Sequence, residues 1–304
     1  MRRLFTGMLA TALAGCACAS PSSNAPPDTS GDGRARGCPR YSPEAVEVGA
    51  TPGVLPELSG LAASRRHPGV FWAHNDSGSA LELFAVVDTG EVLARFALTD
   101  VSALDVEDLA VGPCREGGSD TCVYLADVGD NLRNRGSVQL LRFEEPEVLQ
   151  NGSIPVQALA FSFPEGPRDA ESLVVDARGV PWVISKTGAS LGDVYRLDGL
   201  QPGELGVATK VGEIHAPFHR DRATTAADLH PEGERLLLRT YARVWELRRA
   251  GSTGMEDLLS AEPTEVPSAP QIQGEAIAFS HNGDDYLLGS EGAGAALFRV
   301  TCDR

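Results

Sequence analysis

The sequence predicts an all-β fold, a single five-bladed β-propeller, because three short strand-like patterns each recur five times. The first is a short apolar run entered by a polar or acidic residue: Ser59–Ala62, Glu107–Ala110, Glu171–Val174, Ala227–Leu229 and Glu275–Ala278. The second is a hydrophobic run that ends in polar residues: Phe71–His74, Tyr124–Asp127, Trp182–Ser185, Leu237–Arg239 and Leu287–Ser290. The third carries an aromatic residue in strand-like alternation: Leu83–Phe84, Leu141–Phe143, Val194–Arg196, Val244–Glu246 and Leu297–Arg299. Repeats of roughly 40 to 55 residues built from short strands are typical of propellers.

Each repeat is expected to form strands a, b and c, followed by an outer strand d. The candidates for d are Val92–Leu98, Val156–Phe163, Ala208–Ile214 and Glu262–Ser268. The last repeat ends at Val300 without a d strand, and Ala45–Val48 precedes the first a strand. We therefore expect the N-terminal segment to complete the last blade, which closes the ring and leaves no open edge.

This layout gives the propeller two faces. On the upper face the chain enters each a strand and leaves each b strand. The lower face holds the a–b turns and the c–d connections. Because the a strands line the central channel, polar residues at their starts and at the ends of the b strands should converge on the upper mouth of that channel.

The N-terminus has the features of a lipoprotein leader. Arg2 and Arg3 precede an apolar stretch that is too short to span a bilayer, as in secretory signals. Leu13–Cys16 resembles a lipobox, although an ordinary signal peptide containing a cysteine would read similarly. We expect a signal peptide over residues 1–15, a disordered tether lipidated at Cys16 over 16–37, and the propeller over 38–304. The protein is then exported and lipid-anchored to the bacterial cell envelope, on the periplasmic or surface side of the outer membrane.

The charge balance and the cysteines narrow the partners and the compartment. The 42 acidic and 26 basic residues give a formal net charge of −16, which repels nucleic acid. We expect a monomer that meets the membrane through its lipid and binds a small molecule or an envelope protein. In an exported chain the cysteines should form disulfides, here Cys114–Cys122 and Cys38–Cys302, with Cys18 left over in the tether.

The predicted upper mouth is rich in carboxylates. Glu107, Glu171 and Glu275 begin three of the a strands, with Ser59 and Ala227 in the other two. The ends of the b strands add further polar residues: His74, Asn75, Asp76, Asp127, Asp130, Asn131, Lys186, Arg239 and Glu291. Crowded carboxylates need compensation, and Ca²⁺, with its six to eight oxygen ligands, fits the three glutamates. Two alternatives stay open: neutralisation by Lys186 and Arg239, or a purely architectural role in which the carboxylates accept backbone hydrogen bonds.

Several motifs resemble those of a group of uncharacterised bacterial β-propeller lipoproteins. They are Glu57–Leu61, His74–Gly78, Val106–Ala110, Asp127–Asn131, Asp169–Leu173 and Gly274–Ile277. This group is distantly similar to the phytase-like, or esterase-like, propellers, and the resemblance implies a metal-dependent hydrolase of phosphate or carboxylic esters.

Two functions are therefore expected, and the first is favoured. In the first, the upper face binds a ligand or a partner protein without turnover, with ligand contacts from Asn75, Asp127, Asp130, Asn131 and Glu291. In the second, Ca²⁺ on Glu107, Glu171 and Glu275 supports ester hydrolysis. His74 or Asp76 would act as the base, and Lys186 and Arg239 would stabilise negative charge.

Overall fold

The computed structural model of the protein describes residues 38–76, 78–216, 221–252 and 254–303, which all fall in one compact unit, Gly33–Arg304. The predicted signal peptide, the lipidation site Cys16 and the tether lie outside the described residues. Within the described part of the chain, no helix has the length and apolar character that a membrane span requires.

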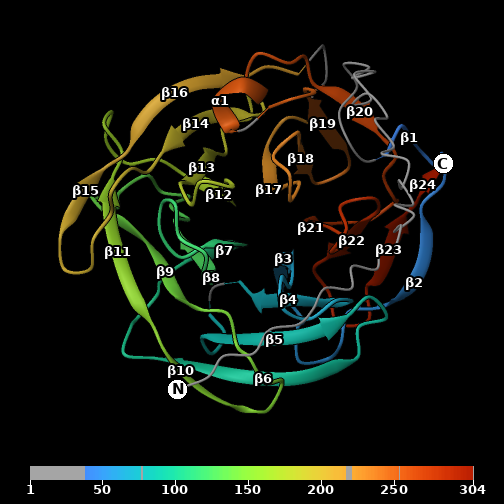
Figure 1. Ribbon diagram of the computed structural model, residues 1–304, viewed down its shortest axis with the longest axis horizontal. Helices are drawn as coiled ribbons and strands as arrows, with labels where there is room; N and C mark the ends of the chain where they lie inside the picture. The colour runs from blue at the N-terminus through green and yellow to red at the C-terminus, as the bar shows by residue number, and fades with distance from the viewer. Residues whose placement is uncertain (1–37, 77, 217–220, 253, 304) are drawn as a thin grey trace, which may run out of the picture. The chain divides into compact units, whose positions relative to one another are not determined.

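Five antiparallel sheets surround a central channel, so the prediction of a five-bladed propeller is confirmed (Figure 1). Blade 1 consists, from the inside outward, of β3 (Leu58–Ala63), β4 (Val70–Asn75), β5 (Glu82–Val87) and β6 (Val92–Thr99). Blade 2 consists of β7 (Val106–Pro113), β8 (Thr121–Asp127), β9 (Val138–Glu144) and β11 (Gln157–Ser162). Blade 3 consists of β12 (Ala170–Val175), β13 (Pro181–Ser185), β14 (Gly192–Arg196) and β16 (Thr209–Ile214). Blade 4 consists of β17 (Thr224–Leu229), β18 (Arg235–Thr240), β19 (Val244–Arg248) and β20 (Thr264–Val266).

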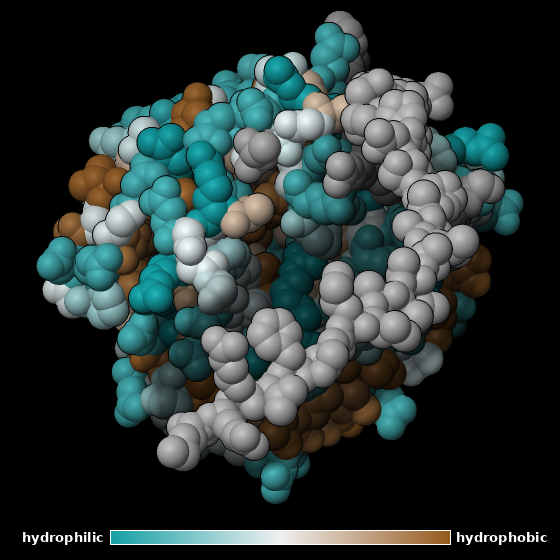
Figure 2. Space-filling model, in the orientation of Figure 1, coloured by the Kyte–Doolittle hydropathy of each residue, from teal (hydrophilic) through white to brown (hydrophobic). Residues whose placement is uncertain are grey.

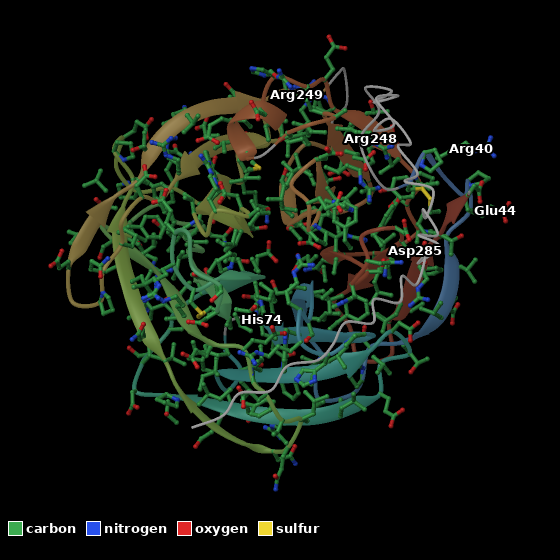
Figure 3. All side chains as sticks on the ribbon, in the orientation of Figure 1. Arg40, Glu44, His74, Arg248, Arg249 and Asp285 are labelled. Atoms are coloured by element: carbon green, nitrogen blue, oxygen red, sulfur yellow. A yellow bond between two sulfur atoms is a disulfide. The ribbon has the colours of Figure 1, made fainter. Side chains whose placement is uncertain are left out.

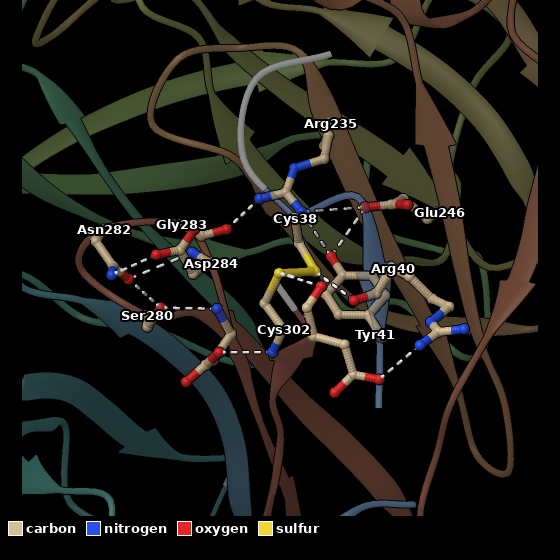
Figure 4. Close-up of a disulfide and its surroundings, with 12 residues drawn as sticks. Cys38, Arg40, Tyr41, Arg235, Glu246, Ser280, Asn282, Gly283, Asp284 and Cys302 are labelled. Carbon is tan, nitrogen blue, oxygen red and sulfur yellow. Dashed lines mark hydrogen bonds and ion pairs between the residues drawn. A yellow bond between two sulfur atoms is a disulfide. The ribbon is translucent and has the colours of Figure 1, made fainter. Parts of the chain in front are cut away.

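Blade 5 is completed by the opposite end of the chain, as predicted. Its strands are β21 (Gly274–Phe279), β22 (Tyr286–Ser290), β23 (Ala296–Val300) and, outermost, β2 (Val46–Ala50). Next to it, β1 (Arg40–Tyr41) pairs with β24 (Cys302–Asp303), and the Cys38–Cys302 disulfide joins the two ends (Figure 4). The second predicted disulfide, Cys114–Cys122, is also present. Two disulfides indicate an oxidising environment, as exported proteins meet.

Hydrophobic residues fill the spaces between neighbouring blades. Each of the five blade–blade interfaces holds one cluster of buried apolar side chains. Three of the largest fully buried side chains are Trp72, Trp182 and Trp245, on blades 1, 3 and 4. Burying one such side chain stabilises the fold by roughly 1.5–3 kcal/mol, so the interfaces hold the blades together.

The c–d connections reach back to the preceding blade, which the sequence patterns do not predict. In blade 2 this connection contains β10 (Gly152–Pro155), which pairs in parallel with β6 of blade 1. In blade 3 it contains β15 (Leu205–Val207), which pairs in parallel with β11 of blade 2. In blade 4 it contains the helix α1 (Met255–Leu258), whose Glu256 forms ion pairs with Arg178 and Arg196 of blade 3. These connections cover outer strands that would otherwise be open edges.

Candidate functional site at the upper mouth

Every a strand carries an irregularity at its second residue. The pairing of a with b shifts register around Ser59, Glu107, Glu171, Thr225 and Glu275. A bulge of this kind leaves one residue out of the ladder and redirects its side chain. In blade 4 the residue is Thr225, so the expectation of Ala227 at this position was wrong. Ala227 pairs with Leu238 as Leu109 pairs with Leu125, which places it two residues further into its strand.

The five bulge residues divide by chemistry. The hydroxyl of Ser59 donates to the carbonyl oxygen of Glu107 at 2.5 Å, and that of Thr225 donates to the carbonyl oxygen of Gly274 at 2.7 Å. Each of these bonds ties one blade to the next. The other three bulge residues are glutamates, all buried.

Two aspartates further along the a strands hold the channel together. The Asp108 carboxylate accepts hydrogen bonds from the backbone N–H of Leu109, Leu173 and Ala227 at 2.8, 2.9 and 3.2 Å. It thereby joins blades 2, 3 and 4. Asp228 likewise accepts from the N–H of Phe279 on blade 5 at 2.7 Å. Burial raises the pKa of Asp108 and brings that of Asp228 to about 7. Accepting backbone hydrogen bonds to hold the blades together was expected as an alternative role of the upper-mouth glutamates. In the structure, Asp108 and Asp228 accept such bonds.

A carboxylate cluster lies at the upper mouth between blades 1, 2 and 3. Its members are Asp76, Asp105, Glu107, Asp169 and Glu171. They form two groups of three, Asp76–Asp105–Glu107 and Glu107–Asp169–Glu171, and within each group one oxygen per residue lies within 4.8 Å of the others. Both groups contain Glu107. These are oxygen ligands of the kind that hard divalent cations prefer.

Asp105 and Asp169 were not among the predicted site residues. Each stands two positions before a bulge glutamate, in the sequences Asp105–Glu107 and Asp169–Glu171. The D-x-E spacing recurs at the start of β7 and of β12, and this repetition was the sequence signal that could have found them.

The electrostatics of the cluster follow from burial and mutual repulsion. Burial, together with the charges of Glu171 and Asp76, raises the pKa of Glu107 to about 10. Burial also raises the pKa of Glu171, but Lys186 lowers it, and the result is about 7.

Lys186 is the counter-ion of Glu171. Its Nζ donates to Oε1 of Glu171 and, at 2.8 Å, to the hydroxyl of Tyr241, above whose ring it lies at 5.0 Å. Although burial opposes it, the Glu171 carboxylate raises the pKa of Lys186, so the ammonium stays charged. The expected neutralisation by lysine is therefore present, at one carboxylate.

Among the described residues, Glu275 lies outside both groups of three, although the charge of Glu171 contributes to its raised pKa. Gln273 Nε2 donates to Glu275 Oε1 at 3.4 Å, and burial together with the neighbouring Glu291 raises the pKa of Glu275 to about 9. Of the three predicted metal ligands, the structure thus brings Glu107 and Glu171 together. The other carboxylates of the cluster belong to aspartates, not to Glu275.

His74 and Arg239 are enclosed by the fold. His74, labelled in Figure 3, is 1% exposed. Its Nδ1 bonds to the Asn75 carbonyl, and burial lowers its pKa to about 4. Arg239 is 0% exposed, bonds to Gln271 Oε1 at 2.5 Å and lies so close to Gly274 that a Cβ there would clash with the guanidinium. Both side chains are therefore buried, whereas the catalytic roles expected for them require contact with a substrate.

Two residues that were predicted to contact a ligand, Asp127 and Asp130, hold the upper loops of blade 2 in place. The Asp127 carboxylate accepts from the N–H groups of Leu104 and Asp105 and pairs with Arg135 at 2.8 Å. The Asp130 carboxylate accepts from the N–H of Arg135 at 2.8 Å and of Asn134 at 2.9 Å. Both aspartates therefore shape the upper loops rather than face a ligand.

The remaining predicted contacts are spread over the upper face. The Asn75 side chain accepts from the N–H of Glu57 at 3.1 Å and donates to the Val54 carbonyl at 2.9 Å, which fixes the loop before β3. Asn131 is exposed, and Glu291 is half-buried beside Glu275. Of these three, Asn131 and Glu291 stay available to a ligand.

Comparison with known proteins adds two distant structural similarities. No known protein family and no curated protein matches this sequence. A catalytically inactive virginiamycin B lyase from Staphylococcus aureus, solved with quinupristin, is similar with 13% identity and a TM-score of 0.40, over 80% of this chain and 66% of that one. Selenomethionine-substituted virginiamycin B lyase from the same organism is similar with 12% identity and a TM-score of 0.43, over 85% and 99%. Neither similarity assigns a function to this five-bladed propeller.

Proposed function

We propose that the protein is an envelope binding module whose upper face holds Ca²⁺ in the carboxylate cluster and presents it to a ligand or partner protein. The observation that carries this proposal is Glu107. Its side chain is 7% exposed, yet neither of its oxygens accepts a hydrogen bond from, or forms an ion pair with, any residue that the structure describes. An ionised carboxylate is costly to bury in this state, and a bound cation removes the cost.

The backbone beside Glu107 is shaped for this arrangement. A Cβ at Gly129 would clash with Oε1 of Glu107 and with Oδ2 of Asp105. The absence of a side chain at Gly129 therefore lets two carboxylates from one blade approach each other, against their repulsion. Such convergence is characteristic of a site that a hard cation completes.

Exposed apolar residues around the mouth support a partner on this face. Leu104, Leu132 and Ile272 are 73%, 83% and 100% exposed and belong to upper-face loops. The loops of Leu104 and Leu132 are both fixed by hydrogen bonds, to Asp127 and Asp130. Large apolar side chains displayed on fixed loops beside a polar site are typical of binding surfaces.

Hydrolysis is less well supported than binding. Of the two residues expected to act as base, His74 is buried and burial lowers its pKa, whereas Asp76 belongs to the carboxylate cluster; Arg239 is buried against Gly274. A screen of phosphate and carboxylic esters, with calcium and with chelator, should therefore show no turnover above background. Calcium-dependent hydrolysis that Glu107→Gln abolishes would contradict the binding proposal.

The proposal includes an N-terminal anchor. Cys38 is joined to Cys302, which follows the last c strand, so the described chain begins on the lower face. Cys16→Ser should shift the protein from the membrane to the soluble fraction of cells, whereas a Cys18→Ser control should stay with the membrane. Membrane association of the Cys16→Ser variant would contradict the anchor.

Thermal unfolding with and without calcium tests the cation. A dissociation constant 100-fold below the free calcium concentration stabilises the fold by about 2.7 kcal/mol, which raises the melting temperature by several degrees. Glu107→Gln should remove most of this gain, and Glu275→Gln, outside the cluster, should keep it. Identical melting curves in calcium and in chelator would overturn the proposal.

A further inference from the structure

The two groups of three carboxylates share one residue and come from three blades. Asp76 follows β4 of blade 1, Asp105 and Glu107 belong to blade 2, and Asp169 and Glu171 belong to blade 3. The shared residue is Glu107, which lies between the other two pairs because its bulge directs it to the mouth. The cluster thus offers two adjoining groups of oxygen ligands, and Glu107 belongs to both.

The shared residue, Glu107, is also a buried carboxylate to which the described part of the chain supplies no partner. Glu107 is more than nine-tenths buried, and the residues described offer its oxygens neither a hydrogen bond nor a counter-ion. On one side, Asp169 accepts a hydrogen bond from the N–H of Asp130 at 3.0 Å and Glu171 is held by Lys186, so these side chains are oriented in advance. On the other side, Asp105 is placed by the bond from its own N–H to Asp127. Because these neighbours are fixed and no described residue pairs with the Glu107 carboxylate, the arrangement points to cations at Glu107.

A carboxylate has two oxygens and can bind one cation through each. Bridging carboxylates of this kind hold two divalent cations about 3.5–4 Å apart in two-metal sites. With three carboxylates around each cation, water or ligand atoms complete the six to eight oxygen ligands of Ca²⁺.

We propose that the carboxylate cluster binds two divalent cations, one in each group of three, with Glu107 bridging them. This inference rests on the proposed function, because it assumes that the cluster binds calcium at all. Its consequence is a ligand class: two adjacent cations with open positions bind an anionic group that spans them, such as a carboxylate or a phosphate.

Calorimetric titration of the chelator-treated protein with Ca²⁺ tests the number of cations. The wild type should bind two per chain. Asp169→Asn, whose amide oxygen can still accept from Asp130, should bind one. Glu107→Gln should weaken both sites by at least tenfold, and Glu275→Gln should still bind two. Circular dichroism of each variant checks that the fold is retained.

Titration with Mn²⁺, followed by electron paramagnetic resonance, tests the bridge directly. Two cations that share a carboxylate should give an exchange-coupled spectrum at two equivalents, which Asp169→Asn should lose. A wild type that binds one cation, removed by Glu107→Gln, would overturn the bridge and leave the single-cation function intact. A wild type that binds none would overturn both.

Discussion

Glu107 and Asp108 are consecutive residues of one strand, and the fold treats their carboxylates in opposite ways. Asp108 accepts three backbone hydrogen bonds from three blades and is fully buried in the channel. Glu107, one residue earlier, lies at the mouth among four other carboxylates, and its own carboxylate accepts no hydrogen bond from the residues described. Glu107 is itself the bulge residue of β7, and the shift in pairing takes it out of the strand's alternation.

A buried carboxylate can therefore affect the stability of the fold in two opposite ways. A carboxylate that backbone N–H groups satisfy stabilises the architecture, and removing it leaves donors without partners. A carboxylate such as Glu107, to which the described residues offer carboxylate neighbours but no hydrogen-bond donor, destabilises the fold until a proton or a cation arrives. The first kind should lose stability on substitution, and the second should gain it in the absence of metal.

The largest effect is expected at Asp108. Asp108→Ala leaves three buried backbone N–H groups without an acceptor, at about 1–3 kcal/mol each, so the free energy of unfolding should fall by at least about 3 kcal/mol. Asp228→Ala, which removes the acceptor of the Phe279 N–H, should cost less. Urea unfolding measures both. A loss below about 1 kcal/mol for Asp108→Ala would show that the channel aspartates do not hold the blades.

Much of the architecture follows from the sequence because propeller strands are repetitive and their ends must meet. The five blades, the completion of blade 5 by β2 and both disulfides were predicted and confirmed. The strands β10 and β15 and the helix α1 were not predicted, since they are short, carry no periodic pattern and are stabilised by contacts with the preceding blade.

The site was predictable only in part, because a sequence pattern does not show which way a side chain is turned. Glu107 and Glu171 were found because they are polar residues at the start of an a strand. In blade 4 the polar residue Asp228 was aligned with the acidic residues of the other repeats, so the bulge at Thr225 was missed. Arg239, at the end of a b strand, carries the same polar signal as an exposed residue there. Its burial depends on Gly274 of the next blade, which no local pattern reveals.

The next largest effect is the dependence of stability on pH without calcium. The pKa of Glu107 is raised from an ordinary 4.5 to about 10 in the folded protein, so the folded state keeps a proton that the unfolded state has lost. The stabilisation is fully present below about pH 4.5 and is lost as the pH rises toward 10. Relative to Glu107→Gln, the wild type should lose about 1.4 kcal/mol of unfolding free energy per pH unit between pH 7 and 9.

Urea unfolding of both proteins at several pH values, in chelator and in calcium, measures this slope. Saturating calcium should abolish the difference in slope, because the cation stabilises the ionised carboxylate. Parallel pH profiles in chelator would mean that the Glu107 carboxylate is ionised and stabilised by the protein itself.

The smallest effect is expected at Gly129, which touches the cluster only through its lack of a side chain. A Cβ there would clash with the oxygens of Glu107 and Asp105, both at the ends of side chains that can turn away. Gly129→Ala should therefore leave the fold stable but displace two ligands, and calcium affinity should fall about tenfold, equivalent to about 1.4 kcal/mol. Gly53→Ala is the matched control, because a Cβ at Gly53, in the upper loop before β3, meets nothing within 4 Å. Calorimetry on the two variants separates the contributions: equal calcium affinities would show that the cations do not sit against Gly129, whereas a loss confined to Gly129→Ala would place them on the Glu107 side of the mouth.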